Sequence, residues 1–248
     1  MKRLILRITA LMFIAPIQAQ TATDIIRQAD EKLRGQSSKA KVTVKIVRPN
    51  WEREITTTSW SLGSDYALIY ISAPARDEGT VFLKRDKEIW NWQPSIERTI
   101  KLPPSMMMQS WMGSDFTNDD LVRESSIVND YTHEFAGDTT ILGRSCYKIV
   151  LTPKLDAAVV WGKIVSYISK AEYLQLMAKF YDEDGFLINE MQGFEVTEFD
   201  GRTLPKRVRM TPMDNPDQYT EMIYEGLEFG IDVNQEFFSQ QNMKRIRP

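Results

Sequence analysis

The sequence of 248 residues contains only one cysteine and one histidine. A single cysteine excludes a disulfide within the chain, and so little Cys and His argues against zinc sites of the usual kind. Histidine is the most common general base in enzymes, so its scarcity leaves few candidates for catalysis. The formal net charge is −3, and the chain therefore lacks the excess of positive charge that is typical of nucleic-acid-binding proteins.

The motifs of several common enzyme classes are also missing. No Gly-x-Ser-x-Gly, Gly-x-Gly-x-x-Gly or P-loop pattern occurs. An acidic group without any accompanying histidine is explained better by charges near a helix N-terminus than by a metal site. That group consists of Asp115, Asp119, Asp120 and Glu124. We therefore expect no catalytic residue, no metal site and no cofactor.

The two rare residues are expected to have structural roles. His133 follows Tyr131 in a predicted strand and has no catalytic neighbour in the sequence, so a structural or surface position is favoured. Cys146 begins the apolar strand sequence Cys146–Val150 and is predicted to be inert in the core. Burial would also protect a free thiol in an oxidising compartment.

The first 19 residues have the pattern of a secretory signal peptide. Lys2, Arg3 and Arg7 precede an apolar run over residues 8–17, which is too short to span a bilayer. The mature chain is expected to begin at Gln20 or at Thr23, and a buried N-terminal helix is the alternative interpretation. Removing residues 1–19 leaves 28 of the 31 Lys and Arg against 34 Asp and Glu, a net charge of −6. Residues 20–248 are thus predicted to form an exported, periplasmic protein.

Hydrophobic periodicity predicts one helix followed by many short strands. The helix is expected over Thr23–Gly35, with Thr23 as its cap and Gly35 as its stop. Residues 103–126 are predicted to form a loop with one or two short helices, and a last short helix is expected over 234–242. The predicted strands span 42–46, 51–62, 65–73, 80–84, 88–93, 98–102, 131–135, 146–152, 164–169, 174–181, 186–199, 204–211 and 219–229.

Roughly a dozen strands in meander order with few helices predict a single antiparallel α+β domain over residues 20–248. A large antiparallel sheet must cover its apolar face. The N-terminal helix and the segment after Pro103 are the only plausible covers. Curved strands that enclose two or three helices would leave a cavity, and such cavities usually hold apolar ligands.

Four methionines lie within seven residues, beside Trp111, at positions 106, 107, 108 and 112. Methionine side chains are unbranched and polarizable, so they adapt to ligands of irregular shape. On a helix, Met108, Trp111 and Met112 would share one face. The segment is therefore predicted to be a soft lid over a lipid cavity, with ordinary core filling as the alternative.

Two further tryptophans are expected on one face of a strand. Trp90 and Trp92 alternate with Ile89 and Asn91, which point to the opposite face. The two indoles could line the cavity or pack against the sheet, and the sequence favours neither. The complete set of residues expected to contact lipid is Trp60, Leu83, Trp90, Trp92, Met106, Met107, Met108, Trp111, Met112 and Phe116.

Several sequence motifs occur together over about residues 22–245. They are Pro74–Leu83 (PARDEGTVFL), Trp90 through Pro94 to Arg98, Met112–Phe116 (MGSDF) with Asp120–Leu121, Cys146–Tyr147 to Pro153–Lys154, Tyr181–Asp182 to Gly185, and Leu204–Pro205. In these motifs the chain resembles the outer-membrane lipoprotein-sorting proteins, the LolA/LolB-like superfamily. It is more similar to the longer, less characterised branch than to the compact lipoprotein carrier.

This resemblance implies an incomplete antiparallel β-barrel, a strongly curved sheet whose concave face is covered by helices. The pocket between sheet and helices would hold acyl chains. Members of the longer branch often accompany RND-type membrane transporters and are thought to handle lipids or lipidated cargo. The compact carrier closes its lid through an arginine. Arg76 lies within a matched motif, but no position is assigned to that role.

We therefore expect a non-enzymatic periplasmic carrier or chaperone. It would bind lipid or the acyl chains of lipoproteins and pass them toward the outer membrane through transient contact. A periplasmic sensor or regulatory binding module on the same fold is the first alternative. An enzyme that acts on a lipophilic substrate is the second, because fold does not fix function.

Overall fold

The computed structural model describes residues 20–122 and 126–247; residues 1–19, with the predicted signal peptide, and Glu124 lie outside this part. The helices are α1 (Ala22–Arg34), α2 (Asn118–Val122) and α3 (Gln240–Arg245), with 3-10 turns η1 (Pro94–Ile96), η2 (Pro104–Met106) and η3 (Trp111–Gly113). The strands are β1 (Ser37–Arg48), β2 (Trp51–Leu62), β3 (Tyr66–Ala73), β4 (Val81–Arg85), β5 (Glu88–Gln93), β6 (Arg98–Leu102), β7 (Tyr131–Ile141), β8 (Arg144–Pro153), β9 (Lys163–Ser169), β10 (Gln175–Tyr181), β11 (Leu187–Phe199), β12 (Arg202–Pro212) and β13 (Tyr219–Phe229).

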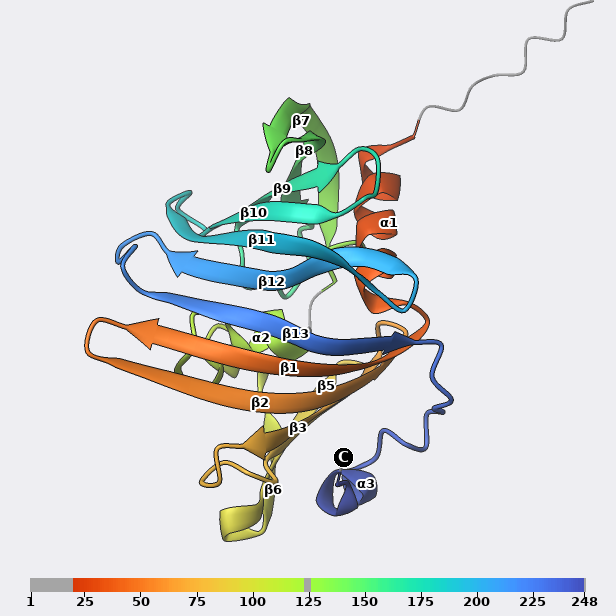
Figure 1. Ribbon diagram of the computed structural model, residues 1–248, viewed down its shortest axis with the longest axis vertical. Helices are drawn as coiled ribbons and strands as arrows, with labels where there is room; N and C mark the ends of the chain where they lie inside the picture. Colours follow the sequence, from red (N-terminus) through yellow and green to blue (C-terminus); the bar gives the residue numbers. More distant parts are fainter. Residues whose placement is uncertain (1–19, 123–125, 248) are drawn as a thin grey trace, which may run out of the picture.

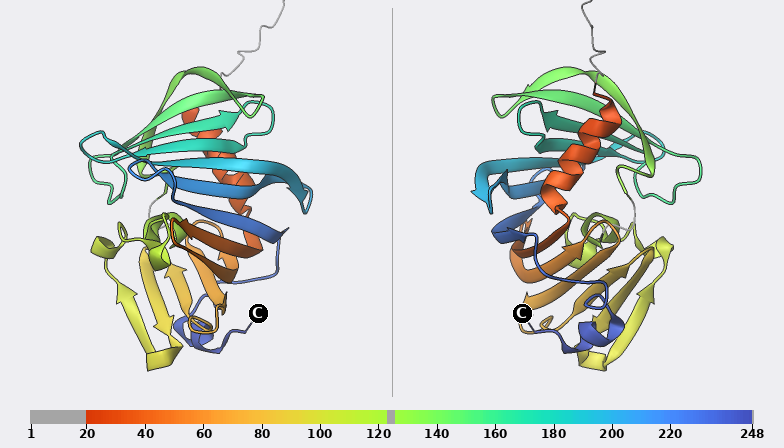
Figure 2. Two further views of the ribbon diagram at one scale, coloured as in Figure 1. Left: turned by 60° about the vertical axis from the view of Figure 1, so that its left-hand side comes forward. Right: turned by 90° about the vertical axis from the view of Figure 1, so that its right-hand side faces the viewer.

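These 13 strands form one sheet in the order β6-β5-β4-β3-β2-β1-β13-β12-β11-β10-β9-β8-β7 (Figure 1). Neighbouring strands are antiparallel throughout. The order follows the chain except at the centre, where β1 pairs with β13 and joins the first half of the sheet to the second. The sheet is strongly curved and remains open, with β6 and β7 at its edges (Figure 2). The predicted antiparallel α+β architecture is confirmed.

Most predicted strands occur within one or two residues of their expected ends, and β2, β5, β6 and β13 have those ends unchanged. The prediction for the seventh strand was too short, because β7 continues from Phe135 to Ile141. A bulge between Phe135 and Asp138 interrupts the pairing with β8, which then resumes. The apolar alternation stops at this bulge, and so the sequence pattern ended there. β1 is also longer than predicted at its N-terminal end.

The start of helix α1 was assigned to the wrong threonine. Thr21, and not Thr23, is the N-cap: its hydroxyl accepts from the backbone N–H of Asp24 at 3.1 Å, and the Asp24 carboxylate accepts from the Thr21 N–H at 3.1 Å. This reciprocal arrangement is a capping box. Gly35 ends the helix as predicted, with its N–H donating to Glu31 O.

The last helix begins six residues later than predicted, at Gln240 instead of Asn234. The side chain of Asn234 accepts from the N–H groups of Glu236 and Phe237, and this local turn competes with a helix. Ser239 then caps α3 by accepting from the N–H of Asn242.

The sheet has an inner face, against which α1 and the segment 103–122 pack. Val42, Val44 and Ile46 of β1 point to this side and form a cluster with Trp111 and Met107. Ile25 and Ile26 of α1 join a second cluster with residues of β7 to β10. The fully buried Cys146 belongs to the first cluster, which confirms its predicted core position, and burial raises the pKa of its thiol.

The outer face of β2 to β5 is covered by the C-terminal segment 231–247. Phe238 and Met243 are fully buried there against Leu68 and Leu83. The Phe238 ring lies 5.7 Å from the ring of Tyr66. Strands β2 to β5 therefore bury side chains on both faces, and this explains why their apolar residues run without clear alternation in β3 and β4.

His133 fastens α1 to the edge of the sheet, which fits the structural role expected for it. Its Nε2 lies 2.7 Å from Ile127 O and its Nδ1 lies 3.0 Å from the Thr23 hydroxyl. The neutral ring satisfies both contacts by donating from Nε2 and accepting at Nδ1. Burial lowers the pKa of His133 below its ordinary value of 6.5.

We expect His133 to make the protein less stable in mild acid. The folded-state pKa lies below the unfolded value, so the contribution of the neutral ring is complete above about pH 6.5 and is lost as the pH falls through the folded-state value. The melting temperature should fall more between about pH 7.5 and about pH 5 in the wild type than in His133→Gln. Equal falls in the two proteins would contradict this assignment.

We expect Phe238→Ala to lower the free energy of unfolding by about 3–5 kcal/mol, because truncation of a buried aromatic side chain leaves a cavity. Phe186→Ala is the matched control. Phe186 is exposed, so its loss should change stability by less than about 0.5 kcal/mol. Urea unfolding measures both changes. A small effect of Phe238→Ala would show that the C-terminal segment is not part of the cooperative fold.

Candidate functional site

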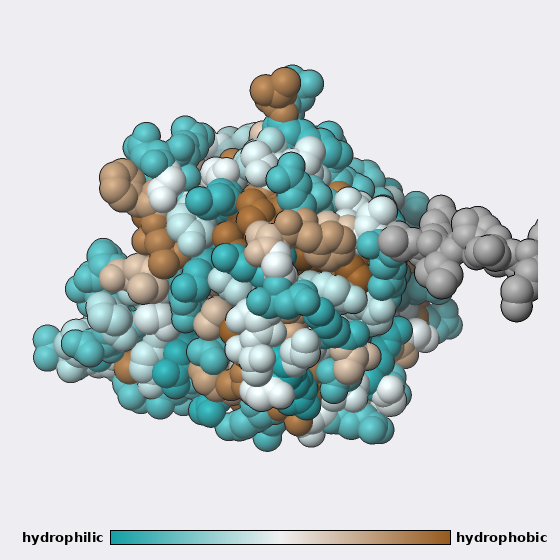
Figure 3. Space-filling model, turned by 90° about the horizontal axis from the view of Figure 1, so that it is seen from above, coloured by the Kyte–Doolittle hydropathy of each residue, from teal (hydrophilic) through white to brown (hydrophobic). Residues whose placement is uncertain are grey.

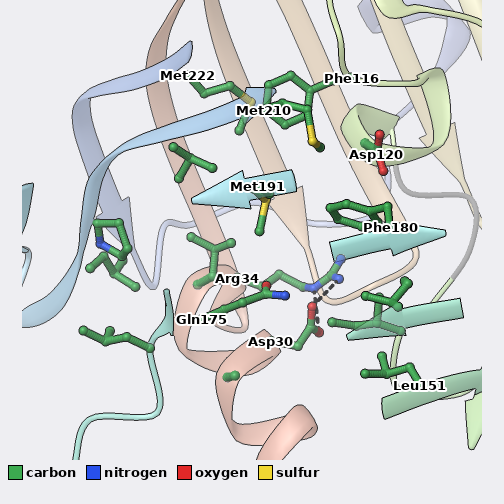
Figure 4. A pocket seen from close by; sticks show the side chains of 18 of the residues that line it. Asp30, Arg34, Phe116, Asp120, Leu151, Gln175, Phe180, Met191, Met210 and Met222 are labelled. Atoms are coloured by element: carbon green, nitrogen blue, oxygen red, sulfur yellow. Dashed lines mark hydrogen bonds and ion pairs between the residues drawn. The ribbon is translucent and has the colours of Figure 1, made fainter. Parts of the chain in front are cut away.

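Two neighbouring cavities lie on the inner side of the sheet. The first has a volume of about 150 Å³ and lies between α1, the start of α2 and strands β7 to β13. Its wall is mostly apolar, and Figure 4 shows its side chains converging from several strands. Apolar residues of this wall include Leu33, Phe116, Leu151, Ile164, Leu174, Phe180, Met191, Leu204, Val208, Met210 and Met222.

The second cavity has a volume of about 160 Å³ and lies beside β1 to β4. Ala40, Val42 and Val44 of β1 form part of its wall, and Trp111 and Leu121 close it from the opposite side. Five residues line both cavities: Leu33, Arg34, Asp120, Met222 and Tyr224. The two spaces are therefore separated only by side chains, from α1, α2 and β13.

The size of these spaces suits small apolar groups. An apolar cavity of about 150 Å³ is large enough to bind benzene. Each cavity can therefore hold a short stretch of a hydrocarbon chain, whereas a longer chain needs both cavities. Movement of the shared side chain of Met222, which is flexible, would join them.

Charged groups lie at the shared wall. Arg34 donates from Nη2 and Nε to the two carboxylate oxygens of Asp30, at 3.0 and 3.3 Å, along α1 (Figure 4). Asp120 is partly buried and accepts from the Thr117 N–H at 2.8 Å and from the Trp161 indole N–H at 3.2 Å. Burial raises the pKa of Asp120, while these donated hydrogen bonds oppose the rise. The polar side chains of the wall are thus held in place by specific hydrogen bonds.

Sequence analysis missed three methionines of the first cavity, Met191, Met210 and Met222 (Figure 4). They come from β11, β12 and β13, where each is a single methionine among alternating polar residues. The cluster is formed only by strand pairing: Met191 lies opposite Met210, and Val208 opposite Met222. The only signal in the sequence was whether each methionine occupies an odd or an even position in its strand, because alternate residues point to opposite faces of the sheet.

The Met/Trp segment does not form the helix face that the i, i+3, i+4 spacing suggested. The backbone makes two separate 3-10 turns, η2 and η3, and Met112 has a positive φ of 50°. Trp111 is fully buried, whereas Met108 is 68% exposed, so the two side chains do not share a face. The prediction of a loop with short helices over 103–126 is confirmed over the described residues of this stretch.

Hydrogen bonds to the sheet fix this segment in place. Arg48 of β1 makes two bonds of 3.0 Å to the carboxylate of Asp115, and both side chains are largely buried. Thr220 of β13 also donates to this carboxylate, at 2.6 Å. Arg53 of β2 donates to Met112 O at 3.1 Å. Asp115 is therefore an anchor for the segment rather than a metal ligand.

Three of the ten residues expected to contact lipid line one of the cavities, and three more belong to the inner cluster or pack against it. Trp111 and Trp60 line the second cavity, and Phe116 lines the first. Met107 is buried in the inner cluster. Met106 and Met112 pack against that cluster and are partly buried.

The remaining four expected residues lie away from both cavities. Leu83, Trp90 and Trp92 are on the outer face, where they pack against the C-terminal segment, and Met108 is exposed. Lys244 of α3 lies over the Trp92 ring at 5.2 Å. For Trp90 and Trp92, the structure therefore agrees with the sheet-packing alternative. Trp60 borders the second cavity, but its ring also lies 5.7 Å from the tilted ring of Phe237 on the outer face.

Other candidates from the sequence make ordinary contacts. Arg76 is exposed in the turn after β3 and pairs with Asp77 at 3.1 Å, and it lines neither cavity. Asp119 and Asp120 lie in the first turn of α2, as expected for acidic residues near a helix start. Within residues 20–122 and 126–247, no group of three or more His, Cys, Asp and Glu is arranged to hold a metal ion.

The outer surface is largely hydrophilic. Seen from the β7 end of the molecule, a hydrophobic area lies near the centre of a mostly polar face (Figure 3). None of the helices in the described part of the chain has the length and apolar character needed to cross a membrane.

We expect two adjacent methionines of the segment to differ sharply in their effect on stability. Met107→Ala should lower the free energy of unfolding by about 2–5 kcal/mol, because Met107 is buried in the inner cluster. Met108→Ala should change it by less than about 0.5 kcal/mol, because Met108 is exposed. Chemical denaturation of the two variants measures the difference. Similar losses for both would argue that the segment forms a helix with another orientation.

The chain resembles several solved structures over nearly its whole length. A DUF1329 family protein from Desulfovibrio piger has a TM-score of 0.80 and 21% identity, and the match covers 90% of this chain and 97% of that one. A putative outer membrane lipoprotein-sorting protein domain from Vibrio parahaemolyticus also has a TM-score of 0.80, with 20% identity and coverages of 90% and 98%. A LolA superfamily protein from Nitrosomonas europaea has a TM-score of 0.78, with 22% identity and coverages of 90% and 99%.

No protein with a curated description matches the chain. The solved structures are less than 25% identical to it, so they establish the fold and not the activity. Over residues 63–245, however, the chain matches the model of a family described as "-like: Uncharacterized protein". The resemblance inferred from the sequence motifs is confirmed: the chain belongs to this uncharacterized family and has the fold of the LolA superfamily and of outer-membrane lipoprotein-sorting proteins.

Proposed function

We propose that this protein is a non-enzymatic carrier that binds lipid, or the acyl chains of lipoproteins, in the two cavities. The observation that carries the proposal is the pair of mostly apolar cavities divided by a few side chains on the inner side of the sheet. The fold supports it, because one solved structure of the same fold is described as a putative outer membrane lipoprotein-sorting protein domain.

The affinity of such a site would be high enough to bind an acyl chain and low enough to release it. Each buried CH₂ group contributes about 0.8 kcal/mol, so eight buried groups would contribute about 6 kcal/mol before the cost of ordering the chain. Transfer then requires no catalyst, only a lower free energy of the acyl chain on the receiving side. Flexible methionine side chains allow the cavities to accept chains of different shape.

The proposed mechanism uses the helical segments as a movable cover for the concave face. Helix α1 and segment 103–122 form one side of the cavities, and we expect movement of one of them to widen the entrance for a chain. The bonds from Arg48, Arg53 and Thr220 of the sheet reach the segment at residues 112–115, so the stretch around η2 is the part that we expect to move. In this scheme Trp60, Trp111 and Phe116, which line the cavities, contact the bound chain.

The cellular setting follows from the sequence pattern. We propose that residues 1–19 direct export and are removed, that residues 20–248 act as one domain in the periplasm, and that contact with the outer membrane is transient. An RND-type inner-membrane transporter is the partner proposed for loading. Determination of the N-terminal residue of the exported protein tests the first step, and retention of Met1 would contradict it.

We expect Met222→Trp to weaken binding of a fluorescent fatty acid at least tenfold, because a larger side chain at the shared wall fills both cavities. Met213→Trp is the matched control: Met213 is exposed, and the same replacement there should leave binding unchanged. Fluorescence titration measures the affinities, and circular dichroism verifies that both variants are folded.

Binding that is equal in the wild type and in Met222→Trp would contradict the assignment of the cavities as the lipid site. Ala40→Leu, which fills only the second cavity, provides an independent variant with a smaller volume change. Native mass spectrometry after gentle purification should detect lipid bound to the wild type and less lipid bound to either cavity variant.

A further inference from the structure

The wall of the second cavity is rich in hydrogen-bond donors. Hydroxyl side chains follow one another along the cavity side of β1 and β2 and into the next turn. They belong to Ser38, Thr57, Ser59, Ser61 and Ser64. By contrast, the strands beside the first cavity contribute mostly methionine, leucine, isoleucine and phenylalanine. Most of these hydroxyls already have partners in the protein: Ser38 and Ser61 bond each other, Thr57 donates to Val42 O, and Ser64 donates to Asp65.

The indole of Trp111 is the most informative of these donors. Trp111 lines the second cavity and is fully buried, and its Nε1 has no hydrogen-bond partner in the part of the chain that the structure describes. Leaving a buried donor unsatisfied is unfavourable, and most buried polar groups in proteins find a partner. The indole N–H of Trp161, near the same wall, does so by donating to Asp120 at 3.2 Å.

Two cationic side chains and the carboxylate of Asp120 lie in the same wall. Lys84 of β4 is buried, and its ammonium donates to Ser64 O at 2.8 Å. The guanidinium of Arg34 lines both cavities and pairs with Asp30. Donors and positive charge together favour a ligand with acceptor oxygens, such as a carboxylate or an ester.

We propose that the second cavity binds the oxygen-bearing end of an acyl ligand, with Trp111 Nε1–H donating to a carboxylate or ester oxygen, while the apolar chain occupies the first cavity. This inference rests on the carrier function proposed above and specifies its ligand class: acyl carboxylates or esters, in preference to plain hydrocarbons. The shared wall of Met222 and Tyr224 is where the chain passes between the two cavities.

Binding of three probes to the full-length mature protein tests the proposal. The probes are palmitic acid, 1-palmitoylglycerol and hexadecane, which share a chain and differ in their oxygen groups. Trp111→Phe removes the N–H and keeps an aromatic ring, and Trp92→Phe on the outer face is the matched control. Loss of one hydrogen bond should weaken oxygen-bearing probes about three- to tenfold in Trp111→Phe and leave hexadecane unchanged.

The response to the two oxygen-bearing probes distinguishes a free carboxylate from an ester. Weaker binding of palmitic acid alone assigns a fatty acid, and weaker binding of 1-palmitoylglycerol alone assigns an acyl ester. Equal binding of all three probes, unaffected by Trp111→Phe, would overturn this inference and leave the carrier function standing. Binding of none of the three would contradict the carrier function itself.

A measurement on the wild type needs the variant only to assign one resonance. In a ¹H–¹⁵N spectrum, the indole resonance that is absent from Trp111→Phe identifies Trp111. It should move downfield when the oxygen-bearing probe is added, because its N–H gains an acceptor, and hexadecane should not cause this shift. An indole resonance that responds equally to all three probes would overturn the proposed hydrogen bond.

Discussion

The ion pair between Arg48 and Asp115 is the contact on which the site depends. It joins the centre of the sheet to the segment between β6 and β7, and both side chains are largely withdrawn from water. Thr220 on the neighbouring strand satisfies the same carboxylate. Removing one partner of such a pair leaves a buried charge without compensation and typically costs about 3–5 kcal/mol. Because this one carboxylate is tied to both β1 and β13, Trp111 and Phe116 on either side of it are held over the two cavities.

A second constraint is that the first half of the sheet buries both of its faces. The C-terminal segment fills the outer face with Phe238 and Met243, and Leu68 and Leu83 are fully buried beneath them. The space left for a ligand is therefore confined to the inner face. There, α1 and segment 103–122 occupy only part of the surface, since two short helices and a few turns cannot cover thirteen strands. The cavities are what remains between these elements and the curved sheet.

The polar residues at the site are consistent with a binding role. Asp120 accepts hydrogen bonds from Thr117 and Trp161, and burial raises the pKa of its carboxyl. Arg34 and Asp30 pair along α1, close to the same wall. These contacts orient the cover against the sheet. The buried indole of Trp111, which has no partner in the described part of the chain, is the exception, and it borders the cavity. Packing alone accounts for the burial of Met107. The buried Trp111 N–H lacks an acceptor in the described part of the chain, and we propose that a ligand oxygen supplies it.

The sequence by itself determined the strands, the turns and the antiparallel order, because alternation of period two and Asp/Gly turns are local signals. Tertiary structure decided which face each side chain occupies. Trp90 and Trp92 were correctly placed on one face of β5, but only the packing of α3 shows that this is the outer face. Met191, Met210 and Met222 meet only through the pairing of β11, β12 and β13. Local patterns show which residues of a strand share a face of the sheet. Which of the two faces is covered by another segment depends on contacts between residues far apart in the sequence.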